Sequence, residues 1–242
     1  MRSFATLAMF VFSATLSAQT PQDIVNRAVR AHGGESALNK TKFMTQRATG
    51  RVNFQGADVD AVREGKWALP ERVLSDVEVT MQGKKVKFVL VLNGLTGWQA
   101  TSGASPTDLS AATYDMLTDE AHVQWLCTIL PLTRKDLTLS AVPPATSDSQ
   151  QCPGVKVAKP GKPDTTLYFH PSTGLLVKAK FKGRGPGGAL DKEFMFSDHK
   201  EIDGVKLPMK VQDFQMGTRM GEWTVKEYRF VDRFEPNTFK KL

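Results

Sequence analysis

Apolar and polar side chains alternate along most of this chain. The alternation is found in segments near 42–54, 58–68, 72–82 and 85–92, and it returns from about residue 137 to residue 231. A period of two is typical of a β-strand with one buried face. The early segments are joined by short turn sequences, Gln55-Gly56, Leu69-Pro70-Glu71, Gln82-Gly83 and Asn93-Gly94. The pattern therefore predicts consecutive antiparallel hairpins.

Two later hairpins have the clearest pattern. In LYFHPSTGLLVKAKF, Leu167 and Phe169 precede a turn at 171–174, and Val177 and Phe181 follow it in alternation. In FSDHKEIDGVKLPMKVQDF, the apolar positions are Phe196 before the turn and Val205, Leu207 and Met209 after it. The turn is Asp203-Gly204, and this dipeptide tolerates the positive φ angles of a tight hairpin. Pro208 has no N–H to donate and indicates an edge or an irregularity in its strand.

Two stretches have the period of a helix instead. Thr20 is a suitable N-cap ahead of Pro21, and Gly33-Gly34 would end that first helix before a short helical piece at 35–40. Between 108 and 129 the alternation is lost and helix formers predominate up to Pro131, which predicts one or two helices, the second capped by Thr118. This insert would cover the open side of the sheet.

These elements define a mainly β chain with helices, of the α+β class, with about eleven strands. A sandwich or a strongly curled barrel is the expected architecture. No linker divides the chain, so residues 19–242 are expected to form a single domain.

The first residues have the layout of a secretory signal peptide. Arg2 precedes an apolar run from Phe4 to Leu16, and cleavage is expected after Ala18, which assigns residues 1–18 to the signal. No later segment has the roughly 20 apolar residues of a membrane helix. We therefore expect an exported, periplasmic, soluble protein. In that oxidising compartment Cys127 and Cys152 would either form a disulfide or remain as two buried thiols.

The chain has a net charge of +7, and some of its cations form one row along a predicted strand. Lys178, Lys180 and Lys182 alternate with the apolar residues of their strand, and Arg184 continues the row. This stripe is either a solvated face that opposes aggregation or a contact surface for acidic lipid head groups or an acidic partner. Nucleic acid is disfavoured by export.

The sequence contains few catalytic signals. Its four histidines lie far apart without metal-ligand spacing, and there is no G-x-S-x-G elbow and no CxxC motif. Asp198-His199 lacks an identified serine partner. The residues indicate no metal and no cofactor. A hydrolase of unrecognised type, acting through Asp198 and His199, is left as a second alternative.

The large apolar residues offer a different function. They could fill a core, or they could leave an apolar cavity on the concave side of a curled sheet, under the helical insert. The expected ligand-lining positions are Phe88, Leu90, Trp98, Trp125, Phe181, Phe196 and Met209.

Five segments carry a resemblance to a known family: IVNRAVRAHGGESALNK, NGLTGW, LYFHPSTGLLVKAKF, FSDHKEIDGVKLPMKV and FEPNTF. They resemble the exported LolA-like group, which is related to the outer-membrane lipoprotein carriers. The resemblance implies an incomplete, half-open antiparallel β-barrel wrapped around lid helices. It also implies a cavity that receives the acyl chains of a lipoprotein or another amphiphile, with transient contacts to membrane or envelope proteins.

The expected function is therefore non-enzymatic binding of a lipid or lipoprotein acyl group in the periplasm. A more specific expectation is that the protein transfers the bound group between membranes. An envelope sensing or scaffold module that binds a protein partner is the alternative. A closed cavity and no copurifying amphiphile would favour that alternative.

Overall fold

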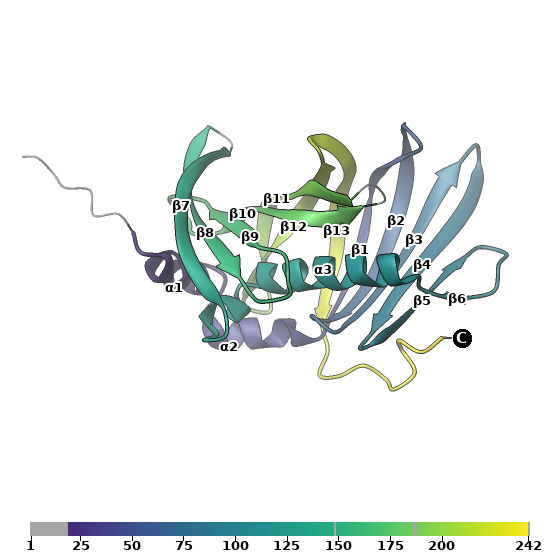
Figure 1. Ribbon diagram of the computed structural model, residues 1–242, viewed down its shortest axis with the longest axis horizontal. Coiled ribbons are helices and arrows are strands. Elements are labelled where there is room, and N and C mark those ends of the chain that lie inside the picture. Colours follow the sequence, from purple (N-terminus) through teal and green to yellow (C-terminus); the bar gives the residue numbers. More distant parts are fainter. Residues whose placement is uncertain (1–18, 148, 186–187, 242) are drawn as a thin grey trace, which may run out of the picture.

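A computed structural model describes residues 19–147, 149–185 and 188–241 (Figure 1). The signal peptide expected at 1–18 lies outside the described residues, as do positions 186 and 187 of the glycine-rich turn. The helices are α1 (Pro21–Ala31), α2 (Gly34–Leu38), η1 (Asn39–Lys42), α3 (Ala111–Cys127) and η2 (Leu130–Thr133). The strands are β1 (Met44–Phe54), β2 (Ala57–Ala68), β3 (Arg72–Met81), β4 (Lys84–Asn93), β5 (Thr96–Thr101), β6 (Thr107–Asp108), β7 (Thr138–Ser147), β8 (Gln150–Ala158), β9 (Thr165–Phe169), β10 (Leu176–Gly185), β11 (Gly188–Ile202), β12 (Val205–Gln215) and β13 (Thr218–Phe230).

All strands of the described chain belong to one 13-stranded antiparallel sheet. Its order is β6-β5-β4-β3-β2-β1-β13-β12-β11-β10-β9-β8-β7. Strands β1 to β6 pair consecutively, strands β7 to β13 do the same, and β1 pairs with β13 to join the two halves. The two ends of this order, β6 and β7, do not pair with each other, and the sheet stays open. The expected open antiparallel barrel with helices is confirmed. It has more strands than the eleven or so expected, and one of them, β6, has only two residues and therefore shows no alternation.

The helices lie on the inner side of the curved sheet. Figure 1 shows α3 running along that side, and its contacts extend from β10 to β4. The first helix, α1, packs on β7, β8 and η2 at one end of the sheet. The inner side is therefore covered unevenly along its length.

Local sequence determines where the two long helices begin. Thr20 and Asp23 form a reciprocal capping box at α1, with Pro21 in the first turn. At α3 the cap is Ser110, whose Oγ accepts from the Thr113 backbone N–H at 3.1 Å. The predicted cap at Thr118 is wrong, because the insert forms one α-helix and Thr118 lies inside it.

The turn at Asp203-Gly204 forms as predicted and has a second role. Asp203 has φ 49° and Gly204 φ 83°, the positive values of a two-residue hairpin turn. A Cβ on Gly33 would stand 2.0 Å from the Gly204 carbonyl oxygen, so the end of α1 packs directly on this hairpin. Lys40 Nζ donates to the Asp203 carbonyl at 2.7 Å. The β11–β12 hairpin therefore anchors the N-terminal helices.

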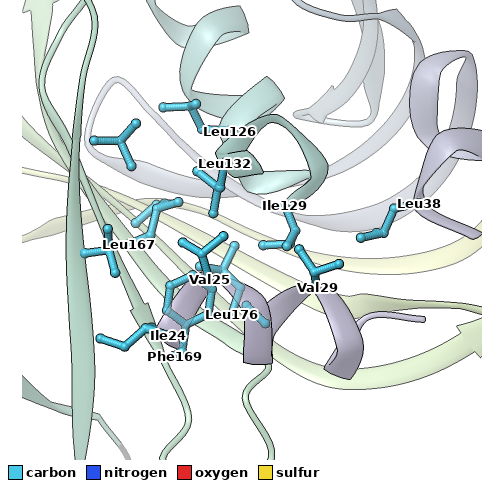
Figure 2. Packing of buried hydrophobic residues seen from close by; sticks show 14 of the residues in the cluster. Ile24, Val25, Val29, Leu38, Leu126, Ile129, Leu132, Leu167, Phe169 and Leu176 are labelled. Atoms are coloured by element: carbon cyan, nitrogen blue, oxygen red, sulfur yellow. The ribbon is translucent and has the colours of Figure 1, made fainter. Parts of the chain in front are cut away.

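One end of the concave side is a closed hydrophobic core. Figure 2 shows side chains from α1, the end of α3, η2 and the β8–β10 strands pointing toward one another. Val25, Leu126 and Leu167 have no exposed surface there. Burying such side chains contributes roughly 1.5–3 kcal/mol each, so this end stabilises the fold.

Candidate ligand-binding cavity

A cavity of about 140 Å³ lies on the concave side, next to the closed core. Its walls come from β1, β2 and β13 on one side and from β11 and β12 on the other, and the last turn of α3 lies against it. The lining residues are Met44, Gln46, Arg63, Trp67, Leu69, Gln124, Cys127, Thr128, Phe194, Phe196, Leu207, Pro208, Val211, Asp213, Trp223 and Tyr228. The surface is mostly apolar with a few polar groups, which is the usual composition of a small-molecule site.

Pro208 lines the cavity in the part of β12 that is not paired with β13. The ladder between these strands begins at Lys210, so Pro208 has no backbone partner on β13. Proline suits this position because it has no N–H to leave unsatisfied. The Pro208 carbonyl accepts instead from the Tyr228 hydroxyl at 2.9 Å. Pro208 therefore stands at an irregularity, as expected, although β12 is an interior strand of the sheet.

A chain of polar groups crosses the floor of the cavity. Tyr228 Oη accepts from Gln46 Nε2 at 3.1 Å, and Gln46 Oε1 accepts from Arg63 Nη2 at 2.8 Å. Burial is the largest effect on the Tyr228 hydroxyl and raises its pKa to about 12. The hydroxyl therefore stays protonated and keeps its bond to the Pro208 carbonyl.

Arg63 is the cation of this floor. Its guanidinium lies over the Trp223 ring, with Cζ 4.4 Å from the ring centroid. Burial lowers its pKa from the usual arginine value, an effect partly offset by Tyr228 and Asp213. The Arg63 Nε atom is buried and has no hydrogen-bond partner among the described residues. This buried N–H is therefore left without an acceptor in the described residues.

Asp213 is the carboxyl group of the same cavity. Burial raises its pKa above the usual aspartate value, while Arg63 acts in the opposite direction. No ion pair joins Asp213 to Arg63 in the part of the chain that the structure describes. The cavity thus holds a cation and a carboxyl group that are not in direct contact.

Ion pairs tie α3 over the sheet. Arg184 of β10 binds Asp119 at 2.7 Å and Asp115 at 2.8 Å, and Lys192 of β11 pairs with Glu120. Asp119 and Lys192 are buried, so these contacts are shielded from solvent more than ordinary surface pairs. They hold the middle of the helix, while its last turn lies against the cavity.

A second cavity of about 30 Å³ adjoins the first and shares five of its lining residues, Cys127, Thr128, Phe196, Leu207 and Pro208. Its polar residues include His32 and His199, whose ring centroids are 6.1 Å apart at 78°. Burial lowers the pKa of each ring to about 4. Both imidazoles are therefore neutral near pH 7.

The seven residues predicted to line a ligand site are dispersed. Phe196 lines the main cavity. Phe181 packs against Phe194 at 5.5 Å between centroids, and Phe88 and Met209 pack on the cluster that surrounds the cavity. Strand alternation puts Leu90 on the same face as Phe88. These four lie around the site without lining it.

Two of the seven lie elsewhere. Trp98 is on the opposite face of β5, where its Nε1 donates to the Phe239 carbonyl at 3.1 Å and the C-terminal segment covers it. Its strand is too short for the sequence pattern to reveal which face is concave. Trp125 packs against His122 and lies under Arg134, with 5.6 Å between ring centroids and 5.6 Å from Arg134 Cζ to the Trp125 ring. Neither residue lines the cavity.

Each cation of the predicted stripe is paired with a carboxylate. Lys178 and Lys180 both pair with Glu193, at 3.2 and 3.1 Å. Lys182 pairs with Asp191 at 2.7 Å, and Arg184 leaves the row to bind α3. The charges that alternation puts on one face are therefore not a free cationic surface.

Cys127 and Cys152 are not joined by a disulfide. Cys127 lines both cavities, and burial raises the pKa of its thiol. Cys152 is buried on β8. The structure therefore corresponds to the second of the two alternatives, separate thiols.

Asp198 and His199 do not form a catalytic pair. Asp198 pairs with Lys210 at 3.3 Å, and His199 Nε2 has no hydrogen-bond partner within the described ranges, so no hydroxyl is held against it. In the same residues no group of three or more His, Cys, Asp or Glu side chains could hold a metal ion. Among the described helices, none has the length and apolar character needed to cross a membrane.

The sequence pattern did not identify the polar floor formed by Gln46, Arg63, Asp213 and Tyr228. A signal for it exists, because Gln46 interrupts the apolar row of Met44 and Ala48. Arg63 is in phase with Ala61 and Trp67, both buried. A charged residue in phase with a buried face indicates a functional position.

No protein-family model matches the sequence, and no curated protein matches it. Solved structures do match in fold. A LolA superfamily protein from Nitrosomonas europaea is 15% identical with a TM-score of 0.58, covering 93% of this chain and 99% of its own. A DUF1329 family protein from Desulfovibrio piger is 12% identical with a TM-score of 0.60, covering 92% and 98%.

A putative outer membrane lipoprotein-sorting protein domain from Vibrio parahaemolyticus is 12% identical with a TM-score of 0.55, covering 92% of this chain and 96% of its own. These similarities confirm the predicted resemblance at the level of fold. The chain has the LolA-like fold over nearly its whole described length, and at these identities the likeness shows the fold alone.

Proposed function

We propose that this protein binds the acyl chain of a lipid or lipoprotein in the concave cavity, as a non-enzymatic periplasmic protein. The observation that carries the proposal is the apolar cavity between β1–β2–β13 and β11–β12, closed on one side by α3. The LolA-like fold supports it, since one neighbour in fold is described as a lipoprotein-sorting domain. A more specific version of the proposal is that the protein transfers the bound chain between membranes.

The size of the cavity limits what it accepts in this conformation. A volume of about 140 Å³ is close to that of engineered cavities that hold benzene, and below the 300–1,000 Å³ of typical ligand pockets. The end of one chain fits, and a longer segment requires α3 to move. Half-buried apolar side chains continue from the cavity along β1–β4 and would contact such a segment, among them Val52, Val77, Met81, Val86 and Phe88.

The first test is native mass spectrometry of protein purified from the periplasm without detergent, followed by organic extraction of what is bound. Discrete extra masses that resolve into acylated molecules are expected. A clean apo mass, together with no uptake of an added fatty-acyl probe, would contradict the proposal. It would favour the alternative of a sensing or scaffold module with a protein partner.

A pair of variants locates the binding. Phe196→Asp puts a charge on the cavity wall and is expected to abolish the extra masses, because burying an unpaired carboxylate beside an acyl chain is costly. Leu95→Asp adds the same charge at a turn residue that is 93% exposed and is expected to leave them unchanged. Equal losses in both variants would mean that binding does not occur in this cavity.

A further inference from the structure

Within the described residues, the half-buried Arg63 guanidinium forms no ion pair with a carboxylate, although Asp213 in the same cavity raises its pKa. Its Nη2 is used by Gln46, and one of its faces lies on Trp223. Its Nε–H has no partner among the described residues, although the atom is buried and the side chain lines the cavity. A buried donor that lacks an acceptor is costly, and a buried charge without a counter-charge more so.

The geometry and charge of the guanidinium indicate which acceptor would suit Arg63. A guanidinium presents its N–H groups as a rigid planar fork, which matches the two oxygens of a carboxylate. An ester or amide carbonyl offers a single acceptor and no charge. Asp213, the carboxyl group lining the same cavity, makes no ion pair with Arg63. An anionic ligand would supply both an acceptor and a counter-charge in direct contact with the guanidinium.

The apolar residues of the cavity indicate how the chain of such a ligand would be oriented. Phe194 and Phe196 of β11 and Leu207 of β12 line the main cavity together with Arg63. Phe196 and Leu207 also line the smaller cavity beyond, which Arg63 does not reach. A chain whose head is at Arg63 would therefore run along Phe196 toward the end of α3.

We propose that the cavity takes a single-chain amphiphile that ends in a carboxylate, with the carboxylate on the Arg63 guanidinium and the chain along Phe194, Phe196 and Leu207. This inference rests on the proposed function, because it names the ligand class for the same site. Such a cavity would recognise the charged head group of its ligand as well as the acyl chain.

The test compares two probes of equal chain length, dodecanoate and 1-dodecanol, by isothermal titration calorimetry at pH 7.5 below their aggregation limits. The wild-type protein is expected to bind dodecanoate at least about tenfold more tightly, the effect of one hydrogen bond to a charged group. Arg63→Gln is expected to remove this preference by weakening dodecanoate binding, while dodecanol binding changes less than about threefold.

Arg51→Gln is the matched control, because Arg51 lies on β1 with its side chain 60% exposed and pairs with Asp60. It should retain the full preference for dodecanoate. Should Arg63→Gln fail to fold, Asp213→Asn replaces it as the test. Removing the neighbouring carboxyl group is expected to maintain or tighten dodecanoate binding, and a loss of tenfold or more would overturn the inference.

The outcomes separate the two proposals. Equal binding of dodecanoate and dodecanol by the wild-type protein overturns the carboxylate inference and leaves acyl binding in place. An equal loss of both probes in Arg63→Gln does the same, because Arg63 would then only support the cavity. No binding of either probe to the wild-type protein overturns the proposed function together with the inference.

Discussion

The two ends of the concave side are built from the same alternating strands and are filled differently. Against β8–β10, the side chains of α1 and the end of α3 leave residues such as Leu167 and Phe169 almost fully buried. In the cluster that extends over β1–β4, β12 and β13, half-buried apolar side chains outnumber buried ones, and the cluster borders a cavity with a polar floor. The first end is a core, and the second has the character of a binding site.

The difference comes from the helices rather than from the strands. One end receives α1, η2 and the last turn of α3 together. The long helix at the other end is α3, with η1 and α2 contacting β13 and β12, and α3 is held by ion pairs with buried members, Lys192 and Asp119. A face covered mainly by a helix that ion pairs hold in place costs less to uncover than a closed hydrophobic core. The comparison predicts different responses to mutation at the two ends.

Truncating an aromatic residue at each end is expected to give the largest effect. Phe169→Ala in the closed core should lower the free energy of unfolding by about 3–5 kcal/mol, because it leaves a cavity among fully buried neighbours. Phe196→Ala should cost about half as much, since its ring already borders a cavity. Urea unfolding of both variants measures this. Equal losses would show that the two ends are packed alike.

The tether of α3 should give the next largest effect. Lys192→Met leaves Glu120 without its partner and is expected to cost up to about 3 kcal/mol, with faster amide hydrogen exchange in α3. The double variant Lys192→Met with Glu120→Met should recover most of that loss, because no charge is then left unpaired. A double variant as unstable as the single one would mean that packing, rather than charge, holds the helix.

The histidine pair between the two ends predicts a pH dependence. His32 and His199 have folded-state pKa values near 4, below the ordinary value of 6.5. Between these pH values the unfolded chain binds more protons than the folded one, so stability is complete above about pH 6.5 and falls as the pH approaches 4. The loss from His32 is about 3 kcal/mol at 1.36 kcal/mol per pKa unit.

The histidine contribution can be separated from that of the carboxylates. His199→Gln should reduce the fall in unfolding free energy between pH 7 and pH 4.5 by about 1–3 kcal/mol relative to the wild-type protein. Denaturant titrations at several pH values measure the difference. Parallel curves for the two proteins would show that His199 takes up its proton equally well in both states.

The outer face should respond least. Lys182 and Asp191 form a largely exposed pair, so Lys182→Gln is expected to change the free energy of unfolding by less than about 0.5 kcal/mol. Binding to anionic lipid vesicles in a sedimentation assay should change less than about twofold, because carboxylates already pair with the cations of this row. A loss of vesicle binding of tenfold or more would identify the stripe as a membrane contact.

The strands and turns could be predicted from the sequence because their signals are local. Asp203-Gly204 requires positive φ, and Phe194, Phe196 and Leu207 share the face that alternation gives them. Which part of that face would stay open was not predictable, because it depends on where α1 and α3 pack. Trp98 shows this limit: its short strand does not reveal which face is concave, and the C-terminal segment covers the residue from the other side.

The polar floor could not be predicted for a related reason. Arg63 and Asp213 are 150 residues apart, counting from 63 to 213, and only the pairing of β1 with β13 brings their strands to one cavity. Gln46 was visible only as an interruption of an apolar row. Its role depends on Tyr228, which pairs with it across the β1–β13 ladder.

The most direct test of the account is photo-crosslinking with a dodecanoic acid that carries a diazirine near the end of its chain, followed by peptide mapping. The account predicts labelling of the segments around Phe196, Leu207 and Cys127, which form the wall between the two cavities. It also predicts that unlabelled dodecanoate suppresses this labelling. Labelling confined to the outer faces of the sheet, or insensitive to competitor, would contradict an acyl-binding cavity.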